Sequence, residues 1–289
     1  MSTVFRRWTV EESAAIEALR DGIGRKKLAS VPPFPEVVGD RKLLRFLRGH
    51  SYDIPKCVEM FTRFLNWRKG ILCTKSREIY SSYDTFCSEN GVDEIRQRIV
   101  REGMNHPSKF PNGEKILSLV PQIVMAHEVS DKNGCPICID QYTFSPTAVL
   151  EEVSVQEYIQ FVIYSLEYRS LILEQLSEEE ERKNLLALSS TTYSSPPSTL
   201  VKQPSTVSSS NGSELPIPPY GVVKYTCVIR DLAGVGFDHL GSRGREIIST
   251  VISLASDNYP ELMRKCFIIN SPFIFNTAWY FIKNLLSQR

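Results

Sequence analysis

The chain has 289 residues, of which 42% are hydrophobic, and its formal net charge is only +1. This length suits two modest domains or one large one. The near-neutral balance excludes the strongly basic surface typical of a dedicated nucleic-acid binder, so we expect no nucleic-acid partner. The amino terminus lacks the apolar run of a signal peptide, and no run of about 18 apolar residues occurs anywhere. With an odd number of irregularly spaced cysteines, seven in all, the sequence predicts a soluble cytoplasmic protein with reduced thiols.

Helices are predicted throughout residues 1–90. Thr9 and Glu12 have the spacing of a capping box, which predicts a helix from residue 10 to about residue 20. A second helix over 39–49 is strongly two-sided, and Asp53 is placed to cap a third. We therefore expect residues 1–90 to form a helical module.

The pattern changes after residue 114. Apolar runs at 117–125 and 136–142, on either side of a turn at 131–134, predict two strands. Ser154 and Glu157 form another capping box, which opens a long helix that we expect to end in the acidic run 178–181. Of the 31 residues from 189 to 219, 20 are Ser, Thr or Pro. This composition predicts a disordered insertion within one domain.

The last part of the chain alternates strands and helices. We predict a strand at 223–230, a turn at 231–234, a helix at 243–256 and a strand at 265–269. The unbroken apolar run of the last strand predicts burial on both faces. A two-sided helix is expected at 276–286. Residues 91–289 are thus predicted to form an α/β domain.

Nucleotide-binding and catalytic motifs are incomplete in this sequence. Gly234 and Gly236 would need a third glycine where His239 stands, so the dinucleotide fingerprint fails. The P-loop glycine spacing that starts at Gly236 continues without the phosphate-binding lysine, since Arg243 follows Ser242. Cys135 and Cys138 have no second Cys/His pair and are interpreted as packing residues. We expect no enzyme activity, no cofactor and no metal site.

Two parts of the chain, each represented by short segments, resemble the CRAL-TRIO lipid-binding family, in particular its phosphatidylinositol/phosphatidylcholine transfer proteins. Residues 42–49 (KLLRFLRG) and 66–69 (NWRK) resemble the helical module that precedes the domain. Residues 231–234 (DLAG), 257–261 (DNYPE) and 268–279 (IINSPFIFNTAW) resemble the domain itself. The resemblance implies a mixed, largely parallel sheet as the floor of an apolar pocket, with 276–286 as an amphipathic gate helix. It implies a monomer that binds one lipid, a phospholipid above all, and carries it between membranes while contacting their surfaces.

The resemblance also implies which residues contact the lipid. Glu261 matches a carboxylate that accepts from inositol hydroxyls, and Thr226 matches a hydroxyl residue that serves a choline-lipid phosphate. The basic pair that meets the inositol phosphate is replaced by His50 and Ser51, and a histidine, with an ordinary pKa near 6.5, is a weaker and pH-dependent cation. Apolar residues are expected at the pocket entrance: Phe273, Phe275 and Trp279.

Two alternatives and one departure accompany the resemblance. The fold could serve as a protein-interaction module without a ligand, or as a nucleotide-dependent enzyme. The chain ends at Arg289, where the family continues through a basic phosphate ligand, a strand and closing helices. We therefore expect the sequence to be truncated and its pocket to lack part of a wall.

Overall fold

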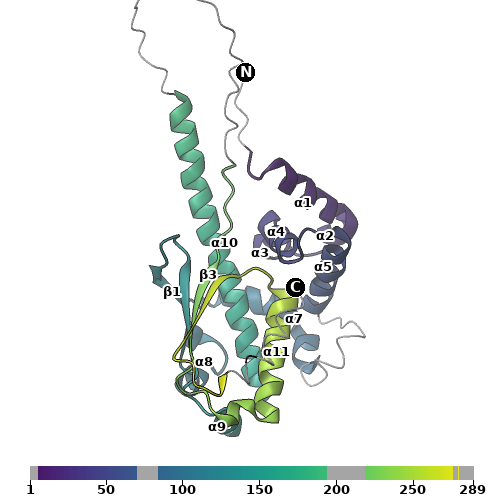
Figure 1. Ribbon diagram of the computed structural model, residues 1–289. Helices are drawn as coiled ribbons and strands as arrows, with labels where there is room; N and C mark the ends of the chain where they lie inside the picture. The colour runs from purple at the N-terminus through teal and green to yellow at the C-terminus, as the bar shows by residue number, and fades with distance from the viewer. Residues whose placement is uncertain (1–5, 70–83, 194–218, 276–278, 280–289) are drawn as a thin grey trace, which may run out of the picture.

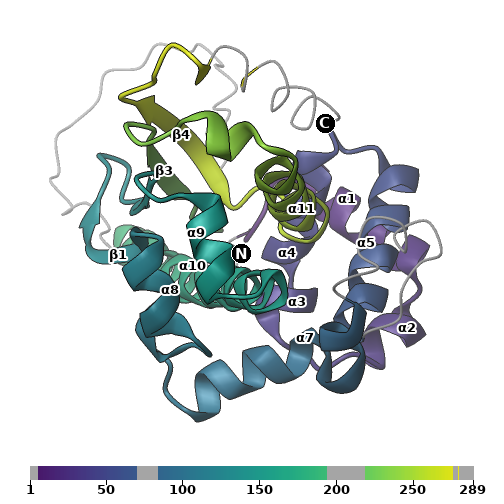
Figure 2. The ribbon, with the colours of Figure 1, turned by 90° about the horizontal axis from the view of Figure 1, so that it is seen from below.

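The fold combines amino-terminal helices, two long helices and a four-stranded sheet (Figure 1). The computed structural model describes residues 6–69, 84–193, 219–275 and 279. Helices α10 (Val155–Tyr193) and α11 (Ser242–Asn258) lie between the sheet and the amino-terminal helices (Figure 2). None of the helices in the described ranges is long and apolar enough to cross a membrane.

The amino-terminal helices begin where their caps predict. Thr9 Oγ1 accepts a hydrogen bond from the backbone of Glu12 (3.1 Å), and Asp53 Oδ1 accepts one from the backbone of Lys56 (3.1 Å). The rings of Phe46, Phe61 and Phe64 then pack against one another in the core. The helices are α1 (Val10–Ile23), α2 (Arg25–Ala29), α3 (Pro35–Val38), α4 (Asp40–Gly49) and α5 (Ile54–Arg68).

The proposed domain boundary after residue 90 falls inside α7 (Asp84–Arg101). There the backbone of Gly91 leaves the helical conformation, with φ 62° and ψ 166°, and a Cβ atom at this position would lie 2.8 Å from the carbonyl oxygen of Arg68. A positive φ and a close backbone approach together favour glycine. The chain thus kinks at Gly91 as it passes the end of α5.

A short helical segment follows α7 and corrects one prediction. After η1 (Pro107–Lys109), helix α8 (Gly113–Leu119) occupies residues 117–119, which were expected to begin a strand. The strand β1 (Gln122–Ser130) starts only beyond Pro121. An apolar run this short is compatible with the hydrophobic period of either a helix or a strand. Here Ile116 and Val120, four residues apart as on one face of a helix, are both buried.

The four strands form a mixed sheet in the order β1-β2-β3-β4. The other strands are β2 (Pro136–Gln141), β3 (Thr226–Asp231) and β4 (Met263–Ile269). β1 pairs antiparallel with β2, and the two remaining pairs are parallel. The predicted α/β class with a mixed, largely parallel sheet is confirmed. In register, Asp140 faces Arg230, which faces Ile268.

The prediction that the last strand is buried on both faces is wrong. All seven residues of β4 are exposed. Among the described elements, β4 packs mainly against its neighbouring strand β3, and no helix covers its faces extensively. The continuous apolar sequence of β4 is therefore not a sign of burial, and its apolar side chains lie at the surface.

Helix α10 begins at its predicted cap but is longer than predicted. The Ser154 backbone donates to Glu157 (2.9 Å), which returns a backbone hydrogen bond to Ser154 Oγ (3.2 Å). The helix continues through the acidic run, where Arg41 of α4 forms ion pairs with Glu174 and Glu181, and it extends to Tyr193. These ion pairs reduce the repulsion between neighbouring carboxylates on this face of the helix. Residues 189–193 are thus helical, and 194–218 of the predicted insertion lie outside the described residues.

The segment before β3 packs along α10, which shortens the predicted strand. The backbone of Val222 donates to Glu181 Oε1 and that of Lys224 donates to Ser177 Oγ, both at 3.0 Å. Since these amides are committed to α10, β3 starts at Thr226 rather than at residue 223. The described residues also form the helix α9 (Pro146–Glu152) and the 3-10 helix η2 (Phe237–Leu240). The predicted helix 276–286 lies, except for Trp279, outside the described residues.

Candidate ligand-binding site

The predicted site residues form two groups, one before and one after β4. Thr226 opens β3 and is paired with Met263 at the start of β4. Glu261 precedes β4, and His50 follows α4. The three aromatic residues of the predicted entrance come after the other end of the strand: Phe273, Phe275 and Trp279.

Thr226 has a defined partner in the protein. Its side chain is buried, and its hydroxyl donates to the carbonyl oxygen of Leu262 at 3.1 Å. The Thr226 backbone amide donates to the same oxygen at 2.7 Å. Thr226 therefore ties the start of β3 to the residue that precedes β4, and its hydroxyl oxygen retains the capacity to accept.

Glu261 and His50 are brought together by close packing at the end of α4. A Cβ atom on Gly49 would lie 3.1 Å from Pro260 Cβ and 3.5 Å from Glu261 Cγ. The Glu261 backbone has a positive φ of 56°, and its carbonyl oxygen accepts from the Arg45 guanidinium. His50 is buried, whereas the Glu261 side chain is partly exposed. The carboxylate is thus at the surface, and its backbone is fixed by α4.

Lys42 holds the same loop from inside the core. Its Nζ donates to the carbonyl oxygen of Asn258 (2.9 Å) and lies 4.3 and 4.9 Å from the ring centroids of Phe64 and Tyr259. Burial lowers the pKa of Lys42 to about 7. Sequence reasoning found that α4 carries a basic stretch but could not show that its partners are backbone carbonyls of the loop before β4.

The aromatic group extends an exposed apolar surface from β4. Phe273 is 94% exposed and Trp279 is 41% exposed, and the rings of Phe275 and Trp279 lie 5.9 Å apart. Of the fourteen large apolar side chains that are exposed in the described ranges, six fall between residues 263 and 279. We call these six the apolar strip: Met263, Phe267, Ile268, Ile269, Phe273 and Trp279. Surface concentrations of this kind mark sites of contact with ligands, proteins or membranes.

A polar cluster on the sheet was missed by sequence reasoning. Arg230 Nε lies 3.4 Å from Asp140 Oδ2, and the two residues face each other in register. Burial raises the pKa of both Tyr142, which follows β2, and Tyr158 of α10. The pKa of Tyr158 is raised further by the neighbouring Tyr142 and Asp140. We call these four residues the sheet cluster. Strand register brings Asp140, Tyr142 and Arg230 together, and the packing of α10 places Tyr158 near Tyr142 and Asp140, so no local signal could have identified them.

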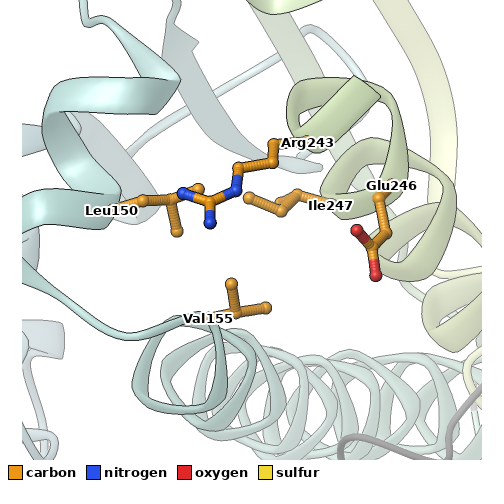
Figure 3. Close-up of a pocket in the computed structure, with 5 residues that line it drawn as sticks. All are labelled: Leu150, Val155, Arg243, Glu246 and Ile247. Carbon is orange, nitrogen blue, oxygen red and sulfur yellow. The ribbon is translucent and has the colours of Figure 1, made fainter. Parts of the chain in front are cut away.

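A pocket of about 310 Å³ lies between α9, the start of α10 and the first half of α11. Figure 3 shows Arg243 reaching from α11 toward Leu150 of α9, while Val155 of α10 points into the gap between them. Its remaining lining residues are Glu246 and Ile247. The pocket therefore combines an apolar wall with one cation and one anion. Arg243 entered the sequence analysis only as the residue that replaces a P-loop lysine.

Cys135 and Cys138 behave as packing residues. Cys135 and Cys138 are both free and buried, as predicted. Within the ranges that the structure describes, no three His, Cys, Asp or Glu side chains are grouped so that they could hold a metal ion.

Comparison with known proteins establishes the class of protein first. Residues 213–289 match the CRAL/TRIO domain. The chain also matches, over all of its length, a solved structure titled "Crystal structure of Sfh5", with a TM-score of 0.52, 14% identity and 79% of that chain covered. At this identity the match shows the fold alone. Residues 213–289 thus match the CRAL/TRIO domain, and the predicted resemblance is confirmed.

Curated relatives narrow the relationship within that class. The phosphatidylinositol/phosphatidylcholine transfer protein SFH12 of Arabidopsis thaliana is 22% identical over 281 residues, covering 96% of this chain and 38% of the relative. The Sec14 cytosolic factor of Schizosaccharomyces pombe is 23% identical, covering 88% of this chain and 65% of the relative. That of Eremothecium gossypii is 26% identical, covering 96% and 66%. The chain spans from 38% to about two thirds of the length of these relatives.

Proposed function

We propose that this protein binds a single lipid, a phospholipid above all, in an apolar pocket and transfers or presents it between membranes without catalysing a reaction. The observation that carries the proposal is the apolar strip, which coincides with the part of the chain that matches the CRAL/TRIO domain. A relative named as a phosphatidylinositol/phosphatidylcholine transfer protein also supports the proposal. The protein acts as a cytoplasmic monomer that contacts membrane surfaces transiently and needs no cofactor.

Apolar contacts supply the affinity in this proposal. Burying a methylene group contributes about 0.8 kcal/mol, so an acyl chain outweighs a head-group hydrogen bond, which contributes about 0.5–3 kcal/mol. The apolar strip offers side chains from β4 and from the residues after it. Polar residues would then select the head group, with Glu261, Thr226 and His50 as the candidates.

The residues after β4 form the entrance. A lipid cannot pass through water without exposing its chains, so the pocket must open against a membrane and offer apolar side chains to it. Phe273, Phe275 and Trp279 take this role, with 276–286 as the gate helix. The exposure of Phe273 supports the assignment, because a ring at the surface is free to enter a bilayer.

A paired substitution tests the proposal. Phe273→Asp should slow lipid transfer between vesicles at least severalfold while the protein stays folded, because a carboxylate at this position opposes contact with the bilayer. Val100→Asp is the matched control, since Val100 is an exposed apolar residue on α7, outside the strip. Circular dichroism melting checks folding in both variants. Equal transfer by the two variants would remove the strip from the mechanism, and absence of any lipid on the unmodified protein would favour the ligand-free interaction module.

A further inference from the structure

The sheet cluster lies on one face of the sheet. Asp140 and Arg230 are opposite each other on β2 and β3, and Ile268 of β4 continues the same row. Tyr142 follows two residues after Asp140, and its amide still pairs with the carbonyl of Asp231 (2.9 Å), so its side chain emerges on the face of Asp140. One repeat back, Cys138 and Val228 are buried in the core that also contains residues of α10.

The donors of the sheet cluster are largely unused. Arg230 Nε is buried and makes no hydrogen bond, since Asp140 at 3.4 Å is beyond the usual range of a charge-assisted bond. Among the described residues, none hydrogen bonds to the two terminal nitrogens of Arg230. The Arg230 side chain is nevertheless 35% exposed and Asp140 22% exposed. Within the described ranges, the terminal nitrogens of the guanidinium therefore face no protein partner.

The surroundings of the sheet cluster are desolvated. Burial raises the pKa of Tyr142 and of Tyr158, and the closeness of Tyr142 and Asp140 raises the pKa of Arg230. Both phenols accordingly stay protonated and act as hydrogen-bond donors. Arg230 has Asp140 as its ionic partner, but its terminal nitrogens have no hydrogen-bond acceptor among the described residues, so an oxyanion would complete their hydrogen bonds.

The balance of donors and acceptors defines the chemistry of that ligand. The sheet cluster has more hydrogen-bond donors than acceptors: two terminal guanidinium nitrogens and two phenol hydroxyls donate, whereas one carboxylate accepts. The planar fork of arginine matches two oxygens of a carboxylate or a phosphate. On the same strand face, Thr226 is two side-chain repeats away, and its hydroxyl already donates to Leu262. Arg230 is thus the open donor of β3 on this face.

We propose that Arg230, Tyr142 and Tyr158 form a subsite for the oxyanion of an amphiphile, a phosphodiester or a carboxylate, with Asp140 positioning the guanidinium. The proposal rests on the proposed function, because it places the head of the lipid while the apolar strip takes the chains. Ile268, which is in register with Arg230 on β4, joins the two surfaces. A polar head bound here would lie against the sheet at the opposite end of β4 from Glu261, so this subsite is an alternative to a head-group position at Glu261, Thr226 and His50.

The test uses three soluble amphiphiles: dihexanoylphosphatidylcholine, decanoate and decanol, which carry a phosphodiester, a carboxylate and no oxyanion. Each is titrated calorimetrically into the unmodified protein, Arg230→Met and Tyr158→Phe. Arg245→Met is the matched control, because Arg245 is an exposed arginine of α11. Arg230→Met should weaken binding of one or both oxyanions about tenfold or more and leave decanol within twofold. Tyr158→Phe should weaken them about threefold, and Arg245→Met should change nothing.

Each outcome bears on a different claim. Loss for the phosphodiester alone or for the carboxylate alone identifies the source of the oxyanion. Equal loss for decanol, or no loss for any ligand, overturns the subsite and leaves the proposed function standing. If the unmodified protein binds none of the three amphiphiles, both fail. Melting curves accompany every titration, and if Arg230→Met does not fold, the result for Tyr158→Phe decides.

Discussion

Arg68 of α5 donates two hydrogen bonds to Glu167 of α10, at 2.8 and 3.0 Å, within the core. Tyr259 of the loop before β4 donates to the same carboxylate at 2.6 Å. Burial by itself raises the pKa of Glu167, but the charge of Arg68 and these hydrogen bonds hold it below its ordinary value. One buried ion pair therefore joins the amino-terminal helices to the helix that supports the sheet.

Removing one member of this pair should be costly. We expect Glu167→Ala to lower the free energy of unfolding by about 3 kcal/mol, because buried Arg68 then keeps only Asp93 as an ionic partner and Tyr259 loses its acceptor. The double variant Arg68→Met with Glu167→Leu should lose less than Glu167→Ala does. Urea denaturation measures all three proteins. Asp21→Ala, which breaks an exposed pair with Arg25, is the control and should leave stability nearly unchanged. A double variant that is less stable than Glu167→Ala would contradict this account.

Lys42 should make stability depend on pH in the alkaline range. Its pKa is about 7 in the folded protein and about 10.5 when exposed in the unfolded chain. Between these values the unfolded chain binds more protons, so the free energy of unfolding rises with pH; below about 7 both states are protonated and this contribution is flat. Urea denaturation at pH 7, 8 and 9 should show that the unmodified protein gains stability with pH relative to Lys42→Met. Parallel profiles would show that Lys42 keeps its proton when folded.

Glu261→Gln should alter selectivity among head groups more than total lipid uptake. The substitution removes the charge while preserving size, and the carbonyl that Arg45 contacts is unaffected. Because the chains supply most of the binding free energy, uptake should change little while preference for inositol lipids over choline lipids falls. Competition between the two lipids in one vesicle population measures the preference. Equal loss for both lipids would assign Glu261 to the fold alone.

Thr226→Val separates a structural role from a ligand role. Losing the hydroxyl bond to Leu262 should cost about 1 kcal/mol, whereas Thr226→Ser should retain it. If the hydroxyl turns from Leu262 to donate to a lipid phosphate, Thr226→Val should reduce choline-lipid uptake, whereas Thr226→Ser should retain it. Uptake that is the same in both variants would leave Thr226 with its structural bond only.

Local signals predicted the fold well where structure is local. The capping residues Thr9, Asp53 and Ser154 begin helices as expected, because a cap needs only residues within one turn. The resemblance to the CRAL-TRIO family supplied the fold class and the residues around β4, which periodicity alone would not have singled out.

Long-range partners decided what the sequence could not show. The acidic run of α10 is paired with Arg41, more than 130 residues earlier, and the start of β3 depends on Ser177 and Glu181. The exposure of β4 depends on which elements cover its faces, and the meeting of Arg230 with Asp140 follows from register. None of these relationships leaves a mark on neighbouring residues in the sequence.

The most direct measurement of the central claim is native mass spectrometry of the purified protein after incubation with vesicles of mixed phospholipids. The proposed function predicts a species heavier than the bare chain by the mass of one phospholipid, whose identity fragmentation then gives. Transfer of that lipid to acceptor vesicles should follow. A protein that shows only its bare mass after incubation, and that moves no lipid between vesicles, would contradict the account.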